Sequence, residues 1–132
     1  MAETRPVARP LSPHLQIYRP MLTMVMSILH RITGVALYIG VILLVWWFSA
    51  AAASEAHFAL VQGFFGSWFG RLVLFGFTWA LIHHMLGGLR HLLWDTGHGF
   101  DLKKVELLAR ANLAGSIAIN ILLWIIGYGV MP

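Results

Sequence analysis

The chain has 132 residues, of which 59% are hydrophobic and 11% charged, against about 25% charged in an ordinary soluble domain. This length predicts one domain, and this composition predicts a membrane protein. The absence of cysteine excludes disulfides, iron–sulfur clusters and covalently attached haem within the chain. The net charge of +4 comes from basic residues dispersed near the ends of apolar segments, so membrane topology explains it better than nucleic-acid binding does.

Residues 1–20 are predicted to form an arm without a regular helix. The arm contains four prolines, and proline disrupts helices because it lacks a backbone N–H donor. It also carries Arg5, Arg9 and Arg19. It does not have the short apolar core and small-residue cleavage site of a cleaved signal peptide. We therefore expect an extended arm on the membrane surface.

The first membrane span is expected at about residues 24–53. No formal charge occurs from Ile32 to Ser54, a stretch longer than the roughly 20 residues that cross the hydrocarbon of a bilayer. Trp46 and Trp47 near the far end of this span fit an interfacial aromatic belt.

Ser27, His30 and Arg31 occupy the first turns of this span, at spacings that place them on one helix face. Arg31 alone is explained by extension of its side chain to lipid headgroups, which is common at helix ends. A hydroxyl, an imidazole and a guanidinium together are more than such anchoring requires. We expect these residues to form a functional cluster.

The sequence from Glu55 to Gly70 predicts an aromatic loop or a short interfacial helix. It is rich in glycine and aromatic residues and contains no lysine or arginine. Gly66 and Gly70 have the spacing of a close helix contact, but one such match in a glycine-rich stretch is weak evidence.

The second span, at about residues 68–94, contains His84 and His91, which are seven residues apart. On a helix, these side chains point about 20° apart and are separated by about 10 Å along the axis. An ionisable side chain within a span is a site hypothesis by default. Between them, Gly87 and Gly88 leave a gap without side chains, where a flat ligand such as a porphyrin could approach the backbone.

His84 and His91 are too far apart along the helix to coordinate one metal from opposite sides. One of them can be an axial ligand, and the opposite ligand must then come from another helix. The second ring nitrogen of such a ligand usually bonds to a carbonyl or carboxylate. Alternatively, His84 is a buried polar residue bonded across a helix interface, and the residues by themselves favour neither explanation.

Two further side chains near this segment need an explanation. His83 points about 100° away from His84 on a helix, so we expect it to pack within the bundle or to face lipid. Asp95 lies near a helix C-terminus, where a negative charge is unfavourable. We therefore expect it to have a basic partner.

The third span is expected at about residues 108–131, where Ser116 and Asn120 could hydrogen-bond to a neighbouring helix. Most lysines and arginines lie in the arm and in the connection between the second and third spans. The positive-inside rule therefore predicts a cytoplasmic N-terminus and an external C-terminus. The Ser27 cluster and His91 then lie at one membrane depth, where their donors could bind haem propionates or a quinone headgroup.

Three motifs in the chain resemble a known family. They are RPLSPHLQIY at residues 9–18, SILHRITG at 27–34 and HMLGGLRHLLWDTGHG at 84–99, and they resemble the cytochrome b556 subunits of mitochondrial and bacterial succinate dehydrogenase, complex II. The resemblance implies an all-α fold of three transmembrane helices, paired with a second membrane-anchor subunit in a helical bundle. Residues 1–132 would form a single membrane-anchor domain in the cell inner membrane.

The resemblance also implies cofactors and site residues. The first histidine of the third motif, His84, would be the axial ligand of haem b iron, and the partner anchor would supply the trans ligand. Ser27 and Arg31 would belong to the ubiquinone site. His30 and Arg31 would lie beside the haem propionates, with His91 as a nearby polar group.

Such a subunit would pass electrons from an iron–sulfur subunit, itself bound to a flavoprotein, to ubiquinone in the respiratory chain and the tricarboxylic acid cycle. It would contribute to quinone reduction but not to succinate oxidation, since the chain has no flavin or nicotinamide fingerprint. Two alternatives stay open. One is a fumarate reductase membrane anchor, and the other is a haem-free helical scaffold or transporter whose histidines relay protons.

Overall fold

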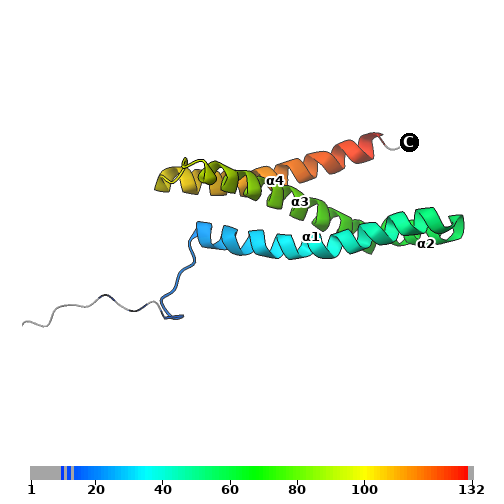
Figure 1. The fold of residues 1–132 in the computed structure, drawn as a ribbon, viewed down its shortest axis with the longest axis horizontal. Helices are drawn as coiled ribbons and strands as arrows, with labels where there is room; N and C mark the ends of the chain where they lie inside the picture. Colours follow the sequence, from blue (N-terminus) through cyan, green and yellow to red (C-terminus); the bar gives the residue numbers. More distant parts are fainter. Residues whose placement is uncertain (1–9, 11, 13, 131–132) are drawn as a thin grey trace, which may run out of the picture.

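The computed structural model describes residues 10, 12 and 14–130, and over these residues the fold is entirely helical (Figure 1). The helices are α1 (Leu22–Ala53), α2 (Glu55–Gly66), α3 (Trp68–Asp95) and α4 (Leu102–Val130). The helices α1, α3 and α4 are long and apolar enough to cross a membrane. The predicted all-α fold with three long apolar helices is therefore confirmed. The last helix begins at Leu102, ahead of the apolar segment, and Glu106 and Arg110 form an ion pair across one of its first turns.

Much of the N-terminal arm, residues 1–9, 11 and 13, lies outside the described residues. The described part forms a turn, in which the amide of Tyr18 donates a hydrogen bond to the carbonyl of His14 at 2.9 Å. The first helix begins at Leu22, directly after Pro20 and Met21.

The helix α1 is longer than a bilayer requires, because its 32 residues extend about 48 Å, against about 30 Å of hydrocarbon. The helix α2 runs back along its end. Trp47 Nε1 donates a hydrogen bond to Gln62 Oε1 at 3.0 Å, and the ring of Trp46 packs against those of Phe64 and Phe65. The two tryptophans therefore hold α2 in place, and the connection predicted as a loop or a short helix is a helix.

The turn from α2 into α3 explains Gly70. A Cβ atom at this position would collide with the carbonyl oxygen of Phe64, whereas a Cβ atom at Gly66 would meet nothing within 4 Å. The spacing of the two glycines therefore reflects a tight turn between consecutive helices and not the packing of one span on another.

The helix α3 packs against both α1 and α4. On the α4 side, His83 is completely buried, and its Nδ1 lies 3.2 Å from Ser116 Oγ. Asn120 Nδ2 donates a long hydrogen bond of 3.5 Å to the carbonyl of Phe75. The predicted hydrogen bonds of Ser116 and Asn120 are thus confirmed. Of the two positions expected for His83, packing within the bundle is right and exposure to lipid is wrong.

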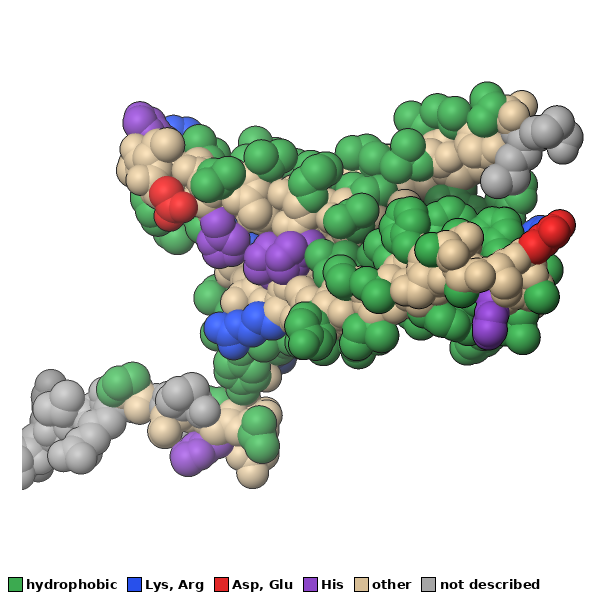
Figure 2. Space-filling model, turned by 45° about the vertical axis from the view of Figure 1, so that its right-hand side comes forward, with side chains coloured by type: hydrophobic (Ala, Val, Ile, Leu, Met, Phe, Trp, Pro, Cys, Tyr) green, Lys and Arg blue, Asp and Glu red, His purple; other side chains and the backbone are tan. Residues whose placement is uncertain are grey.

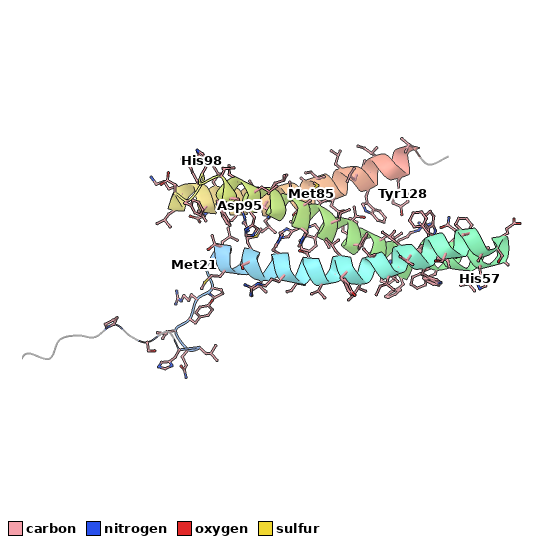
Figure 3. The ribbon with its side chains drawn as sticks, viewed as in Figure 1. Met21, His57, Met85, Asp95, His98 and Tyr128 are labelled. Atoms are coloured by element: carbon pink, nitrogen blue, oxygen red, sulfur yellow. The ribbon has the colours of Figure 1, made fainter. Side chains whose placement is uncertain are left out.

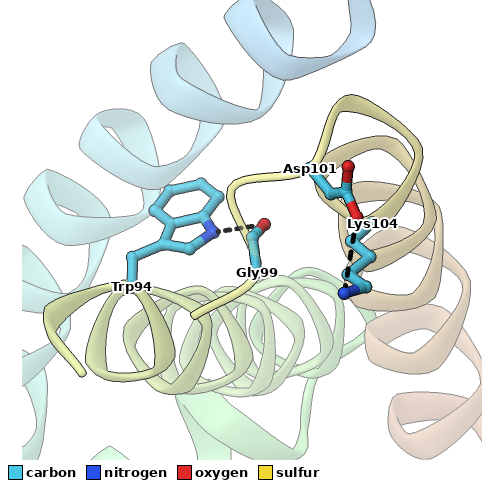
Figure 4. A network of polar contacts seen from close by, with 4 residues as sticks. All are labelled: Trp94, Gly99, Asp101 and Lys104. Atoms are coloured by element: carbon cyan, nitrogen blue, oxygen red, sulfur yellow. Dashed lines mark hydrogen bonds and ion pairs between the residues drawn. The ribbon is translucent and has the colours of Figure 1, made fainter. Parts of the chain in front are cut away.

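The connection from α3 to α4 reverses the chain in a few residues. Gly97 and Gly99 adopt positive φ angles of 80° and 83°, which glycine tolerates because it has no Cβ. Trp94 Nε1 donates to the carbonyl of Gly99 at 3.3 Å, and Lys104 pairs with Asp101 at 3.4 Å (Figure 4).

Asp95 is exposed and forms no ion pair with any described residue. The basic partner expected for it is therefore not found in the described part of the chain. Figure 3 places Asp95 at the same end of the bundle as Met21, while His57 and Tyr128 lie toward the opposite end.

Candidate functional site

Three histidines meet where α1 begins and α3 ends. The rings of His30 and His84 are stacked, with centroids 3.9 Å apart and an interplanar angle of 7°. The ring centroid of His91 lies 5.3 Å from that of His30. The two histidines of α3 therefore share a face, as their spacing predicted, and His30 of α1 contacts both. Figure 2 shows histidine side chains gathered between the helices, on a surface that is otherwise largely hydrophobic.

His84 is held by the backbone of α1. Its Nδ1 lies 3.1 Å from the carbonyl oxygen of His30 and 3.3 Å from Thr33 Oγ1. The Thr33 hydroxyl donates to the carbonyls of Leu29 at 2.8 Å and of His30 at 3.0 Å. Because a carbonyl can only accept, the Nδ1 of His84 carries the proton, and its Nε2 has a free lone pair.

This tautomer is the one that a metal-ligating imidazole needs, with its other nitrogen hydrogen-bonded to a carbonyl. The Nε2 of His84 makes no hydrogen bond to a described residue. The hydrogen bond to α1 is also what a purely structural role for His84 requires. The free Nε2 is the feature that a structural role leaves unexplained.

Glycines make room for the histidine rings on both helices. A Cβ atom at Gly34 would lie 3.1 Å from Cε1 of His84, and one at Gly87 would lie 2.5 Å from Nδ1 of His30. A Cβ atom at Gly88 would meet nothing within 4 Å. The gap expected at both glycines of α3 is therefore open only at Gly88, because the imidazole of His30 fills the space beside Gly87.

The other predicted site residues lie around this stack. His30 turns into the interface between α1 and α3, whereas Ser27 and Arg31 are exposed on the first turns of α1. Neither Ser27 nor Arg31 has a side-chain hydrogen bond or ion pair within the described residues. His91 is exposed, and its ring is perpendicular to that of Trp94, with centroids 5.1 Å apart. The predicted cluster thus consists of one half-buried ring, that of His30, and two exposed donors, Ser27 and Arg31.

The structure adds Arg90, to which the sequence analysis gave no role. Its side chain is only 6% exposed, and its guanidinium lies 5.0 Å from the ring centroid of Trp94. It has no acidic partner among the described residues. A signal was present in the sequence, because Arg90 is the single formal charge between Arg71 and Asp95 and such residues in spans are usually functional.

The described residues contain no group of three or more histidine, aspartate or glutamate side chains that could hold a metal ion. A cofactor that takes one imidazole from this chain and completes its coordination elsewhere fits the arrangement. The free Nε2 of His84, the open backbone at Gly88 and the nearby cation of Arg31 are the parts that such a cofactor would contact.

Comparison with known proteins gives consistent matches. Residues 5–126 match the family "Succinate dehydrogenase/Fumarate reductase transmembrane subunit". A succinate dehydrogenase cytochrome b556 subunit of Paracoccus denitrificans is 43% identical over 126 residues, covering 96% of this chain and 97% of the relative. The corresponding subunit of Rickettsia conorii is 37% identical over 117 residues, covering 89% and 91%. A cytochrome b560 subunit of Marchantia polymorpha is 43% identical over 105 residues, covering 75% and 76%.

Proposed function

This chain belongs to the succinate dehydrogenase/fumarate reductase transmembrane subunit family, and we propose that it is the haem b and quinone-binding anchor of a succinate:quinone oxidoreductase. The observation that carries the proposal is the hydrogen bond from His84 Nδ1 to the carbonyl of His30 at 3.1 Å, which leaves Nε2 free. The names of the matched relatives include cytochrome b556 and b560, which supports b-type haem as the ligand.

His84 is the residue that would hold the haem iron, through its Nε2. Thr33 and the backbone of α1 keep its ring in one tautomer, and His30 keeps the ring in one plane by stacking. Gly88 leaves the backbone of α3 open to a flat macrocycle. When bound, haem b supplies a one-electron carrier. The second membrane-anchor subunit would complete the coordination of the iron.

Hydrogen-bond donors at the same end of the bundle would bind the haem propionates. His30 and Arg31 of α1 and His91 of α3 are the proposed donors, because charge-assisted hydrogen bonds to carboxylates are strong. The buried guanidinium of Arg90, which has no acidic partner among the described residues, adds positive potential to this region.

The proposed ubiquinone site lies beside Ser27 and Arg31. Both side chains are exposed, and their hydroxyl and guanidinium groups can donate hydrogen bonds to the carbonyl oxygens of a quinone. Reduction of a quinone also consumes protons, which groups near the membrane surface can supply. This end of the bundle would receive electrons from an iron–sulfur subunit bound to a flavoprotein.

The proposed orientation places the N-terminus in the cytoplasm and the chain in the cell inner membrane. Its support is the concentration of lysine and arginine in the arm and at the start of α4. The long apolar helices leave large hydrophobic side chains exposed along their whole length. Lipids and the second anchor subunit would cover them.

A fumarate reductase anchor is the second candidate, because the description of the matched family includes that enzyme. Family membership argues against the haem-free scaffold or transporter. Succinate dehydrogenase and fumarate reductase differ in the direction of turnover. This direction depends on the redox potentials of the electron carriers and of the quinone.

The experiment that tests the proposal compares His84→Ala with His57→Ala in the assembled complex. His57 is exposed at the opposite end of the bundle (Figure 3) and serves as the matched control. We expect His84→Ala to remove the b-type signal from the reduced-minus-oxidised spectrum, while His57→Ala retains it. An unchanged spectrum and unchanged quinone reductase activity in His84→Ala would refute the haem assignment.

The quinone assignment has its own test. Ser27→Ala is expected to raise the KM for ubiquinone without removing the haem signal. Ser49→Ala is the control, because Ser49 is an exposed serine elsewhere on α1. Equal KM values in the two variants would exclude Ser27 from the quinone site.

A further inference from the structure

The helices α3 and α4 separate at the end of the bundle opposite the histidines (Figure 1), and a cavity of about 490 Å³ lies between them. Beside the cavity the two helices are still in contact, since the rings of Phe75 and Trp124 lie 5.4 Å apart. The start of α3, the end of α4 and the end of α2 form the walls. The volume lies within the roughly 300–1,000 Å³ of typical ligand sites.

The cavity has one charged group, Arg71. It is the only lysine or arginine between Ile32 and Leu89, and it forms no ion pair with any described residue. Its guanidinium lies 5.9 Å from the ring centroid of Tyr128 on α4. The guanidinium of Arg71 is therefore available to bind an anion, because no described carboxylate neutralises it.

Two of the other polar side chains of the cavity are already engaged. The Thr78 hydroxyl donates to the carbonyl of Leu74 at 2.7 Å. The Gln62 side-chain oxygen accepts from Trp47 Nε1 at 3.0 Å. The Tyr128 hydroxyl and the Trp124 indole N–H form no hydrogen bond with a described residue, and both are donors that could assist Arg71 in binding an anion.

The cavity is amphipathic along the membrane normal. Arg71 lies in the first turn of α3, and Tyr128 lies near the end of α4, so both are at the depth where aromatic and basic residues meet lipid headgroups. From Arg71 to Thr78, seven residues along α3 extend about 10 Å toward the middle of the membrane. The wall along this path includes the apolar side chains of Leu74 and Leu123.

We propose that this cavity binds one anionic glycerophospholipid, with its phosphate on the Arg71 guanidinium and one acyl chain between α3 and α4. A bilayer supplies this combination of an anion at headgroup depth and an apolar chain below it. Basic pockets between membrane helices on the cytoplasmic side bind such headgroups, and Arg71 would bind one on the opposite side. The lipid fills the space where the two helices separate and braces them. None of the residues assigned to haem or quinone takes part, so the proposal stands or falls independently of that function.

The first test measures the lipid that the purified complex retains. Complexes carrying the wild-type chain, Arg71→Gln or Leu123→Trp are exchanged into detergent, and their phospholipids are quantified by mass spectrometry. Arg110→Gln is the matched control, because Arg110 is exposed and pairs with Glu106 near the start of α4. We expect Arg71→Gln, and Leu123→Trp by filling the cavity, to retain one anionic phospholipid fewer per complex than wild type and the control.

The second test adds lipid back to the delipidated complex. Phosphatidylglycerol is expected to raise the Tm of the wild-type complex more than phosphatidylcholine does, and Arg71→Gln is expected to lose this difference. Equal retention of lipid by Arg71→Gln and wild type would overturn the proposal. So would equal protection by the two lipids, or a structure of the complex with a quinone or a helix of another subunit in the cavity.

Discussion

The imidazole of His84 is stacked on the imidazole of His30 and hydrogen-bonded to the carbonyl of the same residue. One residue of α1 thus controls both the plane and the tautomer of the α3 histidine. The two controls are separable, because the carbonyl belongs to the backbone and is kept in any substitution, whereas the stacked ring is not.

The first prediction separates these two controls. His30→Phe retains a flat ring on His84 and the backbone carbonyl, so we expect it to retain more haem per complex than His30→Ala does. The pyridine haemochrome assay on the purified complex gives the haem content. If both variants lose haem equally, the imidazole nitrogens of His30 matter more than its flat surface.

The second prediction contrasts neighbouring glycines on α3. Gly87→Ala places a methyl group 2.5 Å from His30 Nδ1, and relief of such overpacking typically costs about 1–3 kcal/mol. We expect the variant to lower both the Tm of the complex and its haem content. In Gly88→Leu, the new Cβ atom has no neighbour within 4 Å in this chain. This variant is therefore expected to leave the helices packed and to exclude haem by occupying the open backbone.

Measurement of Tm and of the b-type spectrum in both glycine variants checks this contrast. Gly76→Ala is the control, because Gly76 also lies in α3 and a Cβ atom there has no neighbour within 4 Å. Full haem content in Gly88→Leu would show that the macrocycle does not lie over this part of α3.

The third prediction concerns the hydroxyl of Thr33, which lies 3.3 Å from His84 Nδ1. Thr33→Val keeps the side-chain shape, and His84 keeps its bond to the His30 carbonyl. We therefore expect haem to stay bound. Loss of the hydrogen-bond partner of a metal ligand typically weakens binding by roughly tenfold or more, and we expect a smaller loss here. The midpoint potential of the haem is expected to shift. Redox titration measures the shift.

Thr78→Val is the matched control for Thr33→Val. Thr78 also donates to a carbonyl of its own helix, that of Leu74 at 2.7 Å, but it lies at the cavity between α3 and α4. The same shift of potential in both variants would mean that the effect does not pass through His84.

The fourth prediction tests the buried contact between α3 and α4. Ser116→Ala leaves Nδ1 of the completely buried His83 without its partner at 3.2 Å. Hydrogen bonds between membrane helices contribute about 0.6 kcal/mol on average and up to about 1.7 kcal/mol. We expect a loss of stability in that range and an unchanged haem spectrum. Thermal unfolding of the complex measures the loss, with the exposed Ser49→Ala as the control.

The existence and type of the long helices could be predicted, because each is a long apolar run with charges at its ends. The common face of His84 and His91 followed from helical spacing alone. The partners of these residues could not be predicted. The helix α3 carries apolar residues on all of its faces. Its sequence therefore did not indicate that His83 faces α4 or that the Arg90 side chain is buried.

The sequence of α3 alone could not show that a side chain of α1 fills the gap at Gly87. The ring of His30 reaches this glycine only because α1 packs closely against α3, and Gly34 permits that approach by making room for His84. Such a relationship involves the rotation of two helices about their axes. No local pattern in either helix fixes that rotation.

The self-contained bonding of Thr33 has a consequence for biogenesis. Ribosomes make α1 before α3, so α1 enters the lipid before its histidine partner exists. The Thr33 hydroxyl already donates to carbonyls of its own helix. It therefore has a hydrogen-bond acceptor in the hydrocarbon before α3 is inserted. When α3 is inserted, His84 donates to the same His30 carbonyl. The contact between α1 and α3 therefore forms without breaking a hydrogen bond within α1.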